Sequence, residues 1–67
     1  MSNDLIEAVA SVIHATGFHA MAREYRERPE YRSRIEAAMC RNINREFGAE
    51  KAKAFSRLID NAHRCAV

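Results

Sequence analysis

Residues 17–48 read GFHAMAREYRERPEYRSRIEAAMCRNINREFG and decide the fold, because a glycine stands at each end and one proline interrupts them. At about 100° per residue, Phe18, Met21 and Tyr25 share one face of a helix. The same face continues beyond the proline in a stripe of large residues: Tyr31, Ile35, Met39, Ile43 and Phe47. Pro29 disfavours helix at the residue before it but suits the first turn of a new helix. Two interpretations follow: one long helix kinked at Pro29, or a short helix, a tight turn and a longer helix, which we favour.

The glycine at position 48 predicts a second break. A helix continued through Gly48 would turn Phe55 about 160° away from Met39, so the two side chains would not reach one core. We therefore expect a new helix to begin at Ala49. Its inward face is predicted to carry Ala52, Phe55, Leu58, Ile59 and Ala62.

The segment before Gly17 also has helical spacing. Ser2, Asn3 and Asp4 offer N-caps at its start. One apolar face is formed by Leu5, Val9, Val12, Ile13 and Thr16, with Ile6 beside it. We expect Gly17 to end this helix in a left-handed conformation, with Phe18 returning to Ile13 as in a Schellman motif.

These patterns predict an all-α fold in a single domain over residues 1–67. The expected architecture is a compact bundle of three to four short helices, at about 3–16, 18–28, 30–47 and 49–65. Leu, Ile, Val and Phe together number only 13 of 67 residues, so the core is thin and a homodimer would enlarge it. No apolar run approaches the roughly 20 residues of a membrane span, and no secretory signal opens the chain. We expect a cytoplasmic protein that has no membrane partner.

Charge is concentrated in the middle of the chain, where residues 23–45 carry seven Arg against four Glu. Around the proline, pairs at i, i+4 spacing predict a self-paired surface that leaves only Arg26 without an acid. These pairs are Glu24 with Arg28, Glu30 with Arg34, Arg23 with Glu27, and Arg32 with Glu36. The alternative is a phosphate-binding surface with stacking tyrosines. Because Tyr25 and Tyr31 fall on the apolar stripe, we expect them in the core.

The outer face of the third helix is predicted to carry Arg34, Arg41 and Arg45, opposite Met39. No acid on the same helix is well placed for this stripe, so it favours an external anion, either phosphate or a partner's carboxylates. The alternative is that Arg45 reaches an acid on a neighbouring helix. The candidate partner-binding residues are Arg34, Arg41, Arg45, Arg26 and Arg23.

Two polar residues, Asn42 and Glu46, are predicted to lie on the inward arc of the third helix. Buried polar groups need hydrogen-bond partners, which a neighbouring helix would supply. The alternative is that they mark the seam of a dimer.

The sequence indicates neither a metal site nor an active site. The residues that could bind a metal are His14, His19, His63, Cys40 and Cys65, and they lack metal-ligand spacing. The two cysteines could pair only if their Cα atoms came within about 7 Å, and a cytosolic chain would keep them reduced. No phosphate loop, nucleophile elbow or Cys-His signature occurs, so we expect no enzyme activity and no cofactor.

We therefore expect a small binding protein that regulates or inhibits a larger protein with an acidic surface. In size and composition the chain resembles the small accessory proteins of phages and mobile elements, without a residue-level match. One alternative is a nucleic-acid-binding protein that uses an Arg-rich helix face, given a pI of about 8.8. A net charge of only +2 and the lack of a helix-turn-helix pattern argue against it. The second alternative is a structural assembly subunit.

Overall fold

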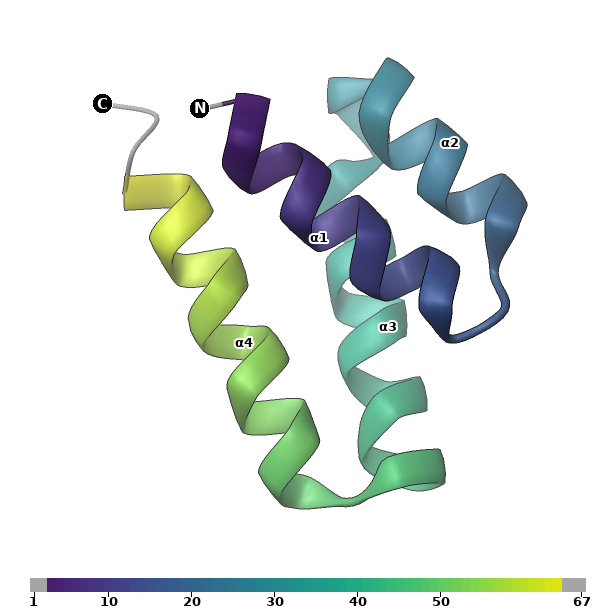
Figure 1. The fold of residues 1–67 in the computed structure, drawn as a ribbon, viewed down its shortest axis with the longest axis vertical. Helices are drawn as coiled ribbons and strands as arrows, with labels where there is room; N and C mark the ends of the chain where they lie inside the picture. The colour runs from purple at the N-terminus through teal and green to yellow at the C-terminus, as the bar shows by residue number, and fades with distance from the viewer. Residues whose placement is uncertain (1–2, 65–67) are drawn as a thin grey trace.

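Figure 1 shows a computed structural model that describes residues 3–64 as two helical hairpins packed against each other. The elements are α1 (Asn3–Ala15), α2 (His19–Glu27), the 3-10 turn η1 (Pro29–Tyr31), α3 (Arg32–Phe47) and α4 (Ala49–Arg64). The predicted all-α bundle is confirmed. The N-cap expected at Ser2 and the end of the last helix at Cys65 lie outside the described residues. None of the helices within residues 3–64 combines the length and hydrophobicity needed to cross a membrane.

The first hairpin turns at Gly17, which has a φ of 99°. The amide of Phe18 donates to the carbonyl of Ile13 at 3.4 Å, and the amide of Gly17 donates to the carbonyl of His14 at 3.0 Å. These two bonds define a Schellman motif, so the predicted cap is confirmed. Across the turn, the rings of His14 and His19 stack with their centroids 4.0 Å apart.

The chain between α2 and α3 follows the constraint that proline imposes. Arg28 is extended, with φ −125° and ψ 91°, which is the conformation favoured before a proline. Pro29 then opens η1, and α3 begins directly after it. The short helix, tight turn and longer helix are therefore confirmed over the single kinked helix.

The core draws residues from all four helices. The buried apolar side chains are Ile6, Val9, Ala10, Ile13, Ala22, Tyr25, Ile35, Met39, Ile43, Phe55, Ile59 and Ala62. On α1, the buried face includes Ile6 and Ala10, whereas Leu5, Val12 and Thr16 are only half-buried. The buried face is therefore rotated from the predicted one, and α1 packs against both α2 and α4.

Three large residues at helix ends remain exposed: Phe18 (38%), Tyr31 (38%) and Phe47 (51%). The prediction of a core position was therefore wrong for Tyr31, and the stripe of α3 is buried only between Ile35 and Ile43. The guanidinium of Arg28 lies 5.8 Å from the Tyr31 ring centroid instead. Periodicity places a residue on a face, but a residue at a helix end is covered only where another helix reaches it.

Replacing either glycine with alanine is expected to destabilise the fold. At Gly48, with φ 97° and ψ 166°, the backbone occupies a region essentially restricted to glycine, so Gly48→Ala should cost about 1–3 kcal/mol. Gly17→Ala should cost roughly 1–2 kcal/mol. No heavy atom lies within 4 Å of a Cβ built at either position, so the cost is conformational and not steric. Urea unfolding of the two variants measures it. Stabilisation by both substitutions would contradict the assigned turns.

Candidate functional site

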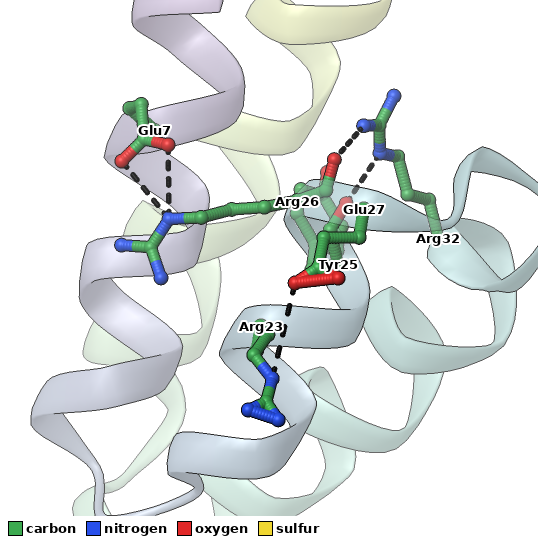
Figure 2. A network of polar contacts seen from close by, with 6 residues as sticks. All are labelled: Glu7, Arg23, Tyr25, Arg26, Glu27 and Arg32. Carbon is green, nitrogen blue, oxygen red and sulfur yellow. Dashed lines mark hydrogen bonds and ion pairs between the residues drawn. The ribbon is translucent and has the colours of Figure 1, made fainter.

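In the Arg-rich turn around Pro29, Arg32 is directed into the fold, whereas Arg23, Arg28 and Arg34 are exposed. Arg32 caps the C-terminal end of α2, because its Nε donates to the carbonyl of Tyr25 at 2.6 Å and its Nη2 donates to the carbonyl of Arg26 at 2.9 Å (Figure 2). The same guanidinium lies 5.5 Å from the Tyr25 ring centroid. The last carbonyls of a helix have no partner within it, so these bonds stabilise the end of α2. The predicted pairing of Arg32 with Glu36 was therefore wrong.

Glu36 instead contacts two other helices. The hydroxyl of Tyr25 on α2 donates to its Oε2 at 2.7 Å, and Nε2 of His63 on α4 lies 3.0 Å from its Oε1. Burial raises the pKa of the Tyr25 phenol strongly, and the hydrogen bond to Glu36 raises it further. Tyr25 is fully buried, as predicted, but the hydroxyl is anchored by a carboxylate. This trio ties α2, α3 and α4 together.

Two of the predicted partner-binding arginines, Arg23 and Arg26, are held in ion pairs of the fold. Arg26 Nε lies 2.9 Å from Glu7 Oε1, which joins α2 to α1, and Arg23 Nε lies 3.8 Å from Glu27 Oε2 (Figure 2). The prediction that Arg26 lacks an acid was wrong, because its partner comes from another helix. Both pairs are exposed, so each contributes little to stability.

The other three predicted residues, Arg34, Arg41 and Arg45, are exposed on one side of α3. Arg41 and Arg45 border a hollow of about 250 Å³ between α2 and α3. Its remaining lining residues are Phe18, Met21, Ala38, Met39 and Asn42. Arg34 lies on the same helical stripe, two turns earlier, and does not line this hollow.

The stripe has one acidic neighbour on its own helix. Arg45 Nε lies 3.3 Å from Glu46 Oε1, so the expectation that no acid of α3 serves it was wrong. Glu46 is exposed, and its predicted inward position was also wrong, whereas Asn42 is half-buried. Within residues 3–64, no carboxylate oxygen lies within 4.0 Å of the Arg41 guanidinium. Arg41 therefore remains available to an external anion.

Two further hollows adjoin the first around the C-terminal end of α3. One of about 270 Å³ shares Phe18 and Asn42 with the Arg41 hollow and adds Thr16, Glu46 and Phe47. The larger one, of about 470 Å³, shares Thr16 and Phe47 with its neighbour. Its other lining residues are Val12, Ala15, Ile43, Lys51, Ala54, Phe55 and Leu58. We call the three together the α3 end surface.

Sequence reasoning missed the apolar part of the α3 end surface. Phe18 and Phe47 are each adjacent to a turn glycine, and that adjacency is the signal that could have revealed them. A large apolar residue directly beside a turn lies where covering helices end. Nothing in the pattern separates Lys51, which lines the large hollow, from Lys53, which does not.

The cysteines and histidines form no ligand cluster in the described part of the chain. Within residues 3–64, no three His, Cys, Asp or Glu side chains are grouped so that they could hold a metal ion. Burial raises the pKa of the Cys40 thiol, with the carboxylates of Glu36 and Asp60 adding to the effect. Cys65, the other half of the considered pair, lies outside the described residues.

Comparison with known proteins identifies no relative of this chain. The chain matches no protein-family model, no curated protein and no solved structure. The function is therefore argued from the α3 end surface itself.

The buried phenol makes stability fall at high pH. The folded chain holds the Tyr25 proton above the ordinary pKa of 10.0, so this contribution is complete below pH 10 and is lost as the pH rises further. Tyr25→Phe should cost about 1–3 kcal/mol at neutral pH, because Glu36 loses a donor. It should also flatten the decline in the free energy of unfolding above about pH 10.

Urea unfolding at several pH values between about 8 and 11 tests this expectation. Tyr31→Phe is the matched control, because Tyr31 is exposed. It should keep both the neutral stability and the alkaline slope of the wild type. Equal slopes for Tyr25→Phe and the wild type would contradict the assignment.

Proposed function

We propose that this chain is a small non-enzymatic binding protein that regulates or inhibits a larger protein by covering an acidic part of its surface. The observation that carries the proposal is the hollow in which Arg41 and Arg45 border a floor that includes buried Met39. Arginine forks match carboxylates in geometry, and their planar groups are easily desolvated. A carboxylate in this hollow would meet two cations while neighbouring atoms of the partner cover the apolar floor.

The apolar lining favours a protein over a nucleic acid. The hollow is lined by Phe18, Met21 and Met39, which form no favourable contact with a phosphate. Methionine and aromatic side chains are instead enriched at protein interfaces. Nucleic-acid binding draws its affinity from many phosphate contacts. Here the fold itself occupies Arg26, which pairs with Glu7, and Arg32, which caps α2. The hollow itself presents only two arginines, Arg41 and Arg45, so it could contact few phosphates.

Occlusion is the mode of regulation that suits a chain without a catalytic motif, because occupying a partner's surface requires no chemical step. The charged hollow then determines the orientation of the complex, because charge complementarity suppresses wrong arrangements.

The test reverses the charge of the hollow and compares it with a matched reversal elsewhere. Arg41→Glu with Arg45→Glu should abolish capture of the partner by tagged protein expressed in its own organism, because like charges across a buried contact cost several kcal/mol. The fold should lose at most about 1 kcal/mol, since both side chains are exposed. Recovered proteins are identified by mass spectrometry, and thermal unfolding verifies the fold.

Lys53→Glu with Arg57→Glu is the control, because it makes the same change in net charge at i, i+4 spacing on the exposed surface of α4. It should retain the same partner. Equal loss in both variants would mean that overall charge decides binding and would contradict the proposal. A complex with duplex DNA whose affinity falls steeply with salt would favour the nucleic-acid alternative instead.

A further inference from the structure

The largest of the three hollows of the α3 end surface lies where the two hairpins differ in length. The helices α3 and α4 each have 16 residues, whereas α1 has 13 and α2 has 9. In Figure 1, α1 ends while the α3–α4 hairpin continues toward the connection between its two helices. The hollow of about 470 Å³ adjoins this uncovered part and is lined by the last residues of α1 together with α3 and α4.

The lining of this hollow continues the core of the bundle. Ile43 and Phe55 belong to the buried core and also border the hollow, while Leu58 is half-buried and Phe47 is 51% exposed. This part of the α3–α4 hairpin therefore exposes apolar surface. Nearer the opposite end of the hairpin, α1 covers apolar surface of the same kind. A further helix laid beyond the end of α1 would cover the exposed part in the same way.

The charges around the hollows decide what kind of helix fits. The charged residues that line the α3 end surface are Arg41, Arg45, Lys51 and Glu46. Three of these four residues are cations, so two copies facing each other through this surface would bring more like than opposite charges together, which costs free energy. An apolar segment with carboxylates beside it would instead meet cations, with Lys51 at the large hollow and Arg41 at the small one.

We infer that the large hollow between α1, α3 and α4 binds the apolar face of an amphipathic, acidic helix of the partner protein. The inference rests on the proposed function and extends it, since it names the element of the partner that docks. Large apolar residues at i, i+3, i+4 and i+7 of that helix would enter the hollow. Its glutamates or aspartates would lie toward Lys51.

The probe is a designed peptide of about 16 residues, with leucines at these spacings on one face and glutamates beside them. A second peptide of the same composition has the leucines shuffled so that no apolar face forms. Titration followed by amide NMR should show that the first peptide binds the wild type at least about tenfold more tightly than the second. The shifted amides should include those of Thr16, Ala54 and Leu58.

Two pairs of matched variants locate the binding. Ala54→Glu places a carboxylate in the hollow and should weaken binding of the peptide at least about tenfold, because a charge would be buried against leucine. Ala37→Glu, at an exposed alanine of α3 outside the hollow, should not. Lys51→Glu should lower the affinity for the peptide severalfold. Lys53→Glu, at an exposed lysine outside the hollow, should leave that affinity unchanged.

Equal binding of both peptides, or no effect of Ala54→Glu, would overturn the inference. So would a dimer in sedimentation velocity that Ala54→Glu abolishes, because the occupant would then be a second copy of this chain. The proposed function is tested separately by the Arg41 and Arg45 variant. If that variant loses its partner while the peptide results are negative, only the helix inference fails. If it keeps its partner while the peptide results are positive, only the proposed function fails.

Discussion

The buried carboxylate of Glu36 fixes how the two helical hairpins meet. It is the one charged group buried in the core within residues 3–64, and it is 8% exposed. A buried carboxylate is costly unless hydrogen-bonded, and its contacts with Tyr25 and His63 offset that cost. Because the three residues come from three helices, sliding α2 or α4 would remove one of the two partners of Glu36, and sliding α3 would remove both. Apolar contacts alone would tolerate such a shift more easily.

This constraint determines which part of the α3–α4 hairpin is covered. Glu36 lies in the first turns of α3 and His63 in the last turn of α4, so α2 is held at that end of the hairpin. Arg32 strengthens the arrangement, because it caps α2 from the start of α3. The first hairpin is too short to reach the other end as well. The exposure of Phe47 and the large hollow beside it therefore follow from the position of one buried contact.

The helix boundaries could be predicted from the sequence because local rules decide them. A glycine with positive φ and a proline that excludes helix at the preceding residue act within a few positions of the chain, as at Gly17, Gly48 and Pro29. The ion pairs could not be predicted in the same way. Arg26 meets Glu7 across 19 positions, and Glu36 meets His63 across 27, so each outcome depended on tertiary packing.

The candidate site was predictable in part for the same reason. The stripe of arginines on α3 follows from helical spacing alone, and the structure leaves Arg41 exposed there. The hollows depend on how far α1 and α2 extend over α3. Residue spacing within a helix cannot predict that extent. Phe47 shows the difference, because its phase on α3 matches that of buried Ile43 and only the missing cover distinguishes them.

The apolar residues and the arginines of the α3 end surface contribute to binding in different ways. Covering a side chain such as Phe47 or Leu58 is worth about 1.5–3 kcal/mol for full burial, and such gains mainly slow the dissociation of a complex. Exposed arginines add little net affinity, but they accelerate encounter with an acidic surface and select its orientation. Apolar contact alone would be tolerant of many partners, and charge alone would be weak at physiological salt. Because Phe18 and Asn42 line both the Arg41 hollow and its neighbour, and Phe47 and Thr16 line both that neighbour and the large hollow, one continuous partner surface can use both contributions at once.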